Sequence, residues 1–171
     1  MIEQRILEEL RVAARQHAEW AELCPAFDSD AASVHLAVMV EPFLSYILRG
    51  EKTVESRFSK HAIAPFGRVR SGDLVLLKAG PVVGSFHVSS IDFVTVDDGQ
   101  LDDLRREYSD ALCANEDDFW ESRTGKRYVT LMGVDKVREL PPVPVSKRDM
   151  RGWVVLTPAP SSMYPDQLAL M

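Results

Sequence analysis

The segment 50–57, GEKTVESR, gathers two cations and two carboxylates where the chain should leave a helix and enter a strand. Side chains two apart in a strand point to the same face, so we expect Glu55 and Arg57 to share one. Charged groups are costly to bury unless they are solvated or hold a polar ligand. The chemistry available is an ammonium contact from Lys52 to phosphate, an acceptor in Glu55 for a base's amine, and a forked contact from Arg57 to phosphate or carbonyl.

Each of these residues also has a purely structural interpretation. Lys52 would be a surface lysine paired with Glu51 or Glu55, and such pairs are weak. Glu55 and Arg57 would form an ion pair at the mouth of a barrel, which is compatible with Glu55 holding Arg57 for a ligand. As catalytic groups, Lys52 and Glu55 would act as a general base and its orienting partner that together activate water.

Aromatic side chains near this segment offer stacking surfaces. Tyr46 lies in the expected short helix, six residues before Lys52. It could stack on a base or donate its hydroxyl into a cleft. Trp153 and Phe58 are further stacking candidates. The alternative for all three is a place in the core, where large aromatic side chains are mostly found.

The net charge of −6 is unevenly distributed along the chain. Residues 49–78 carry seven Lys/Arg and three Asp/Glu, and residues 122–151 carry eight and three. Between them, residues 92–121 carry two Lys/Arg and eleven Asp/Glu. If the two basic segments meet, they form a local positive patch suited to a phosphate-bearing ligand of limited size. The overall acidity argues against a protein that coats long nucleic acid.

We expect this patch to be a rim of basic side chains around the cleft. A barrel that pairs strand 57–60 with strand 152–156 would bring the two segments together to contact RNA phosphates. The alternative is a set of scattered, solvated charges. The rim would consist of Lys60, His61, Arg68 and Arg70 from one segment and Lys147, Arg148 and Arg151 from the other.

Short strands interrupted by two helical insertions predict an α+β fold, a small mixed β-barrel with flanking helices and an added N-terminal helix. Prolines 141, 142 and 144 should exclude regular strand pairing there. The helices are expected at 2–23, 43–49 with Gly50 as its left-handed end, 101–114 and 117–122. The strands are expected at 34–40, 52–58, 74–78, 82–88 with an extension over 89–96, 127–134, 136–140 and 152–156.

The chain divides into an N-terminal helix and linker (1–33), a barrel domain (34–156) and a Pro-rich tail (157–171). No apolar run is long enough to span a membrane, and the first residues lack a signal-peptide core. Cys24 and Cys113 form no metal or redox pattern, so we expect reduced thiols in a cytoplasmic protein. His35, His61 and His87 lack metal-ligand spacing, and no glycine-rich phosphate loop is present, so we expect neither metal nor cofactor.

Three stretches together resemble the ASCH domain, a branch of the PUA-like superfamily. Residues 42–57, PFLSYILRGEKTVESR, are similar to its helix-then-strand pattern G-x-K-T-x-E-x-R. Residues 72–78 with 82–84 are similar to the superfamily's barrel hairpin, and 147–154, KRDMRGWV, to the closing strand of some ASCH members. The resemblance covers residues 34–156 and implies a cleft beside the short helix, lined by Lys52, Glu55 and Arg57.

The resemblance also implies a range of functions. PUA-like barrels commonly bind RNA or single modified nucleotides, and some small ASCH proteins are amidohydrolases that remove an acyl group from a modified cytidine. In those enzymes a threonine proposed as the nucleophile stands three residues after the lysine. Here that position is Glu55, which puts the covalent mechanism in doubt. Thr53 should point to the opposite strand face, and Glu107 or Glu116 would have to supply the remaining acid.

The expected function is therefore binding of RNA or a nucleotide in the basic cleft. The first alternative is a small amidohydrolase acting on an acylated cytidine nucleoside. The second is a protein-interaction domain, such as a homodimer through the apolar stripe of Ile6, Leu10 and Trp20. The residues assigned to ligand or RNA binding are Tyr46, Lys52, Glu55, Arg57, Lys60, Arg68, Arg148, Arg151 and Trp153.

Overall fold

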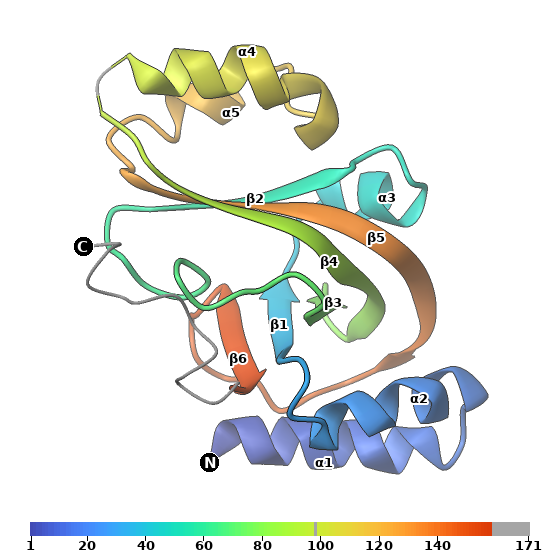
Figure 1. Cartoon of the computed structure of the whole chain (residues 1–171). Helices are drawn as coiled ribbons and strands as arrows, with labels where there is room; N and C mark the ends of the chain where they lie inside the picture. Colours follow the sequence, from blue (N-terminus) through green and yellow to red (C-terminus); the bar gives the residue numbers. More distant parts are fainter. Residues whose placement is uncertain (98, 159–171) are drawn as a thin grey trace.

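A curled sheet of six strands organises the protein in a computed structural model, which describes residues 1–97 and 99–158 (Figure 1). The strand order is β2-β5-β4-β3-β1-β6. Only β1 and β3 pair in parallel, and the other neighbours are antiparallel. The α+β fold predicted from the sequence is confirmed. The strands are β1 (Val34–Val38), β2 (Val54–Ser59), β3 (Leu74–Lys78), β4 (Val82–Thr95), β5 (Tyr128–Val143) and β6 (Trp153–Thr157).

The sheet curls into a half-barrel, and its two edges are β2 and β6. The expected pairing of strand 57–60 with strand 152–156 is therefore wrong. Arg57 bridges the two edges instead, because its guanidinium donates from Nη2 to Val38 O (2.9 Å) and from Nη1 to Gly152 O (3.3 Å). The opening between the edges is thus held by a side chain that also belongs to the charged segment 50–57.

The first 28 residues form three short helices rather than the single helix expected over 2–23. These are α1 (Ile2–Ala14), α2 (Ala18–Leu23) and the 3-10 helix η1 (Cys24–Asp28). The chain turns at His17, whose backbone is extended (φ −134°, ψ 119°). The turn lets Ile6, Leu10 and Trp20 all enter one core, where each is fully buried. The apolar stripe that motivated a homodimer is thus covered within this chain.

Helices α4 (Gln100–Leu112) and α5 (Asp117–Glu121) lie at the opposite end of the molecule, beside β2 (Figure 1). They form a separate apolar cluster with the β2–β5 end of the sheet. Helix α3 (Phe43–Leu48) is followed by its cap residue Arg49 and then by Gly50, whose φ of +78° confirms the left-handed residue predicted after this helix. Strand β2 begins at Val54, so Lys52 lies in the turn before the strand and not in it.

The prolines near residue 141 disrupt regular pairing, as expected: Gly84 pairs with Glu139 and Val82 with Val143, with a register shift between the two pairs. They do not end the strand, however. A single strand, β5, replaces the two expected at 127–134 and 136–140, and it reaches Val143, which pairs with Val82. The edge strand β2 covers β5 only from Tyr128 to Gly133. Beyond that point one side of β5 is unpaired, so a residue without an N–H is tolerated. The carbonyl of Pro141 accepts a hydrogen bond from Trp20 Nε1 at 2.8 Å.

Candidate functional site

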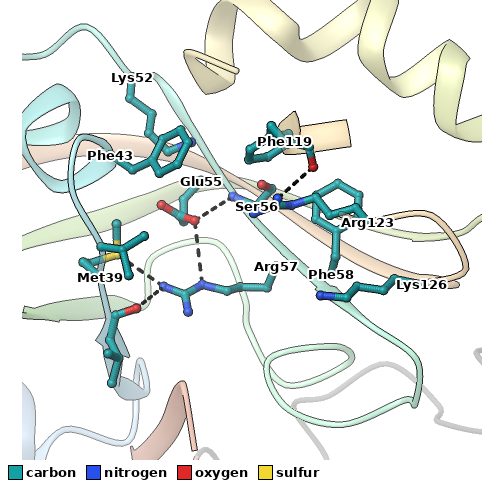
Figure 2. Close-up of a pocket in the computed structure, with 12 residues that line it drawn as sticks. Met39, Phe43, Lys52, Glu55, Ser56, Arg57, Phe58, Phe119, Arg123 and Lys126 are labelled. Carbon is teal, nitrogen blue, oxygen red and sulfur yellow. Dashed lines mark hydrogen bonds and ion pairs between the residues drawn. The ribbon is translucent and has the colours of Figure 1, made fainter. Parts of the chain in front are cut away.

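A pocket of about 240 Å³ lies between β2, the segment after β1, α3 and α5 (Figure 2). We call it the Glu55 pocket. Four cations line it against one carboxylate among the described residues, and aromatic rings supply much of the remaining wall. It is lined by Val38, Met39, Val40, Phe43, Lys52, Glu55, Ser56, Arg57, Phe58, Phe119, Arg123 and Lys126.

Lys52 is 2% exposed and extends from the α3–β2 turn toward α4. Its Nζ donates to Leu112 O at 2.8 Å and lies 5.2 Å from the centre of the Phe43 ring. Burial lowers the pKa of Lys52, while the carboxylate of Glu55 opposes that shift. The side chain therefore caps the last carbonyl of α4 and presents an ammonium that can lose its proton more readily than a solvated lysine.

Glu55 is 5% exposed and has unused hydrogen-bonding capacity. Its Oε1 accepts from the backbone N–H of Ser56 at 3.0 Å and lies 3.7 Å from Arg57 Nε, too far for a hydrogen bond. Its Oε2 is buried without a partner. An unpaired buried carboxylate oxygen is costly, so a donor group in the pocket would find a strong acceptor there.

Arg57 shares the face of β2 with Glu55, and both line the pocket, as their spacing predicts. The guanidinium of Arg57 donates to Val38 O and Gly152 O across the opening of the sheet. Its Nη2 also contacts Met39 Sδ at 3.2 Å (Figure 2). Its Nε is buried without a hydrogen-bond partner. The guanidinium is thus fixed by its two Nη atoms, and its Nε–H remains available to a ligand.

Arg123 and Lys126 also line the pocket, and the sequence analysis missed both. They lie in the turn between α5 and β5. Arg123 Nη1 donates to Phe119 O at 2.8 Å, and its guanidinium carbon lies 3.5 Å from the centre of the Phe119 ring (Figure 2). Burial lowers the pKa of Arg123, and Glu55 opposes the shift. The available sequence signal was the cluster of cations at 123–127, directly after the aromatic pair 119–120.

Tyr46 and Trp153 lie outside the Glu55 pocket. Tyr46 lines a neighbouring hollow of about 430 Å³ on the other side of Phe43, with the guanidinium carbon of Arg49 5.4 Å from its ring centre.

Trp153 is buried, and its Nε1 donates to Nδ1 of His35 at 3.1 Å. Since an indole can only donate, His35 Nε2 carries the hydrogen that Asp73 Oδ2 accepts at 2.9 Å. Trp153 contacts the Glu55 pocket only indirectly, because the guanidinium carbon of Arg57, which lines the pocket, lies 5.3 Å from the centre of the Trp153 ring.

The expected basic rim is not assembled around this pocket. Lys60, Arg68, Arg148 and Arg151 are exposed, and none is among the described residues that line it. Arg151 forms ion pairs with Asp149 (2.7 Å) and Glu3 (3.5 Å). The two basic segments do meet, but through residues 123–126 rather than 147–151.

The described residues as a whole show neither a metal-binding cluster nor a membrane-spanning helix. No cluster of three His, Cys, Asp or Glu side chains among them could hold a metal ion. None of the described helices combines the length and the apolar character needed to cross a bilayer.

Comparison with known proteins adds evidence on the fold. No family model matches this sequence. A search of curated proteins also finds no match. Among solved structures, the chain is similar to the ASCH protein from Zymomonas mobilis, with 13% identity and a TM-score of 0.57 over 72% of this chain and 87% of that one. Two single-residue variants of that protein give TM-scores of 0.57 and 0.56, at 12% and 13% identity, over 72% of this chain and 87% and 89% of theirs. At such identities the likeness concerns the fold, and the chain therefore has an ASCH-like fold.

Proposed function

We propose that this protein binds RNA or a nucleotide, with one base in the Glu55 pocket. The observation that carries the proposal is the buried Oε2 of Glu55, which has no partner although it lines an accessible pocket. A carboxylate in this position accepts hydrogen bonds from an exocyclic amine, as in contacts of Glu with cytosine N4. The pocket favours bases that carry an exocyclic amine, such as cytosine and adenine, over uracil, which has none.

The other lining groups suit the rest of a nucleotide. The rings of Phe43 and Phe119 provide apolar wall for a base, and Arg57, Arg123 and Lys126 supply positive charge for phosphate. The volume of about 240 Å³ lies below the roughly 300–1,000 Å³ of pockets that enclose drug-sized ligands. A single base with part of its sugar is the portion of RNA that this space can receive.

Calorimetric titration with the 5′-monophosphates of cytidine, adenosine and uridine tests the proposal. We expect cytidine and adenosine monophosphate to bind more tightly than uridine monophosphate, with affinity falling as salt rises. Glu55→Gln should weaken binding of the amine-bearing nucleotides by about tenfold, because the amide keeps one acceptor but loses the charge. Arg106→Gln, at an exposed site on α4, is the control and should bind like the wild type. Equal affinities of the Glu55 variant and the wild type would reject the proposal.

The amidohydrolase alternative has one observation in its favour, the lowered pKa of Lys52 beside Glu55. In that reaction, Lys52 in its neutral form removes a proton from water as the water oxygen bonds to the acyl carbon. Lys52 then gives this proton to the leaving nitrogen as the C–N bond breaks, so that the free amine and the carboxylic acid leave and the lysine is neutral again. Thr53 is exposed and is not among the described residues that line the pocket, so a water nucleophile fits better than a threonine ester. Chromatography of N4-acylated cytidines incubated with the protein tests this. Turnover that Lys52→Met and Glu55→Gln both abolish would support it, and absence of turnover would count against it.

A further inference from the structure

Besides the hollow at Tyr46, two further pockets share lining residues with the Glu55 pocket. The Tyr128 pocket, about 180 Å³, shares Arg57 and Phe58 with it. The turn pocket, about 560 Å³, shares Arg123 and Lys126 with it. Because a shared residue forms part of the wall of both pockets, the Glu55 pocket adjoins each of these two.

Four aromatic residues are among the described residues that line the Tyr128 pocket. The rings of Tyr128 and Phe66 lie edge to face, with centres 5.2 Å apart, and Phe58 and Trp153 are the other two. Arg57 forms its boundary with the Glu55 pocket. Aromatic faces next to a guanidinium are the surfaces on which unstacked bases pack in single-stranded nucleic-acid sites, with little dependence on base identity.

The turn pocket has a different character, being rich in cations. Arg123, Lys126 and Arg127 line it together with Thr124 and Gly125. Asp97 lies 3.5 Å from Arg127, but both side chains are largely exposed, so this pair is weak and solvent-screened. Three cations against one described carboxylate leave a positive surface, which suits the phosphates of a polynucleotide backbone.

We infer that the three pockets form one continuous site for a short single-stranded RNA, a conclusion that rests on the function proposed for the Glu55 pocket. One base enters the Glu55 pocket, the adjacent base packs in the Tyr128 pocket, and the backbone on the other side follows Arg123, Lys126 and Arg127. The site accommodates on the order of three nucleotides, one for each pocket. Duplex RNA is excluded, because paired bases cannot present their faces and edges to such pockets.

Fluorescence anisotropy and calorimetry with oligocytidylates of one, three and five nucleotides test this inference. We expect affinity to rise by about tenfold or more from one to three nucleotides and then to level off. Arg127→Gln and Tyr128→Ser should remove most of this gain and leave the affinity for cytidine monophosphate unchanged. Arg106→Gln again serves as the matched exposed-arginine control. Thermal unfolding of each variant verifies that it remains folded.

The outcomes separate this inference from the proposed function. If the mononucleotide binds but longer chains bind no more tightly, the continuous site is wrong and the single-nucleotide pocket stands. A gain with length that persists in both flanking variants would also overturn the continuous site. If no mononucleotide or oligonucleotide binds, the proposed function fails, and this inference fails with it.

Discussion

The guanidinium carbon of Arg57 lies 5.3 Å from the ring centre of Trp153, so a cation on one edge of the sheet packs against an aromatic ring on the other. Trp153 donates a hydrogen bond to His35, and His35 donates one to the buried Asp73. Asp73 also accepts from the backbone N–H groups of Ser33 and Arg70. A chain of contacts therefore links the Glu55 pocket to the turn before β3. The position of Arg57 depends on residues that never touch the pocket.

Replacing Arg57 should reduce both stability and ligand binding. Arg57→Lys keeps the charge but cannot reach Val38 O and Gly152 O together, so we expect a loss of about 1–3 kcal/mol in the free energy of unfolding. Urea denaturation measures this loss. Arg15→Lys, at an exposed site after α1, should change the value by less than about 0.5 kcal/mol. A stable Arg57 variant would show that the bridge across the sheet opening contributes nothing.

The titration of Lys52 offers a direct test of its buried environment. Because burial disfavours the ammonium, its pKa should lie below the ordinary 10.5. Between the lowered pKa and 10.5 the unfolded chain binds the proton and the folded chain does not, so this group makes stability rise with pH across that window. NMR of ¹³C-labelled lysine side chains, with the Lys52 signal assigned from Lys52→Met, measures the midpoint.

Glu55→Gln provides an internal check on this titration. The carboxylate of Glu55 favours the charged form of Lys52, so its removal should lower the midpoint further. A midpoint for Lys52 at or above 10.5, or one that rises in Glu55→Gln, would contradict the buried placement of the ammonium.

Gly133 is required by a bulge in the neighbouring strand. Ser89 and Ser90 of β4 bulge out opposite Gly133, between the pairs Val88–Val134 and Ile91–Met132. A Cβ at Gly133 would lie 2.5 Å from Ser90 Oγ and 3.1 Å from Ser90 N. We expect Gly133→Ala to cost about 1–3 kcal/mol in the free energy of unfolding. Gly152→Ala is the control, since its Cβ would meet only Arg57 Nη1 at an ordinary 3.6 Å. Equal stability of the two variants would contradict this packing.

The N-terminal helices should be part of the folded unit rather than an appendage. Leu10 is fully buried against the sheet, so Leu10→Ala should lower the free energy of unfolding by about 2–5 kcal/mol. Val12, on the same helix, is 44% exposed, and Val12→Ala should be nearly neutral. Urea denaturation of both variants, monitored by tryptophan fluorescence, measures the difference. A small effect at Leu10 would favour a loosely attached helix.

The sequence predicted the structure best where turn residues and side-chain periodicity within a short segment determine it. Strand β3 was predicted at its observed bounds, because Gly72-Asp73 and Gly80-Pro81 mark both ends of an apolar run. The approach of Glu55 and Arg57 likewise follows from strand periodicity alone. The pattern could not reveal the turn at His17, since apolar spacing continues across it while only tertiary packing decides whether the helix bends.

The other differences between the structure and the expectations from the sequence depend on contacts between residues far apart in the chain. Whether prolines near 141 interrupt β5 depends on which strand lies beside them, and the sequence does not show that β2 stops at its pairing with Gly133. The entry of Arg123 and Lys126 into the pocket depends on how the α5–β5 turn folds over β2. A charge count identifies the segment 122–151 as basic, but it does not distinguish residues 123–126 from residues 147–151.

The placement of β1 has a consequence for how the chain acquires its structure during synthesis. Its apolar residues pair on one side with β3 and on the other with β6, and β6 follows the other described strands in the sequence. The ribosome therefore releases an aggregation-prone segment well before both of its partners exist. Contacts between regions so distant in sequence slow folding, so one side of β1 stays without its strand partner until Trp153–Thr157 emerges.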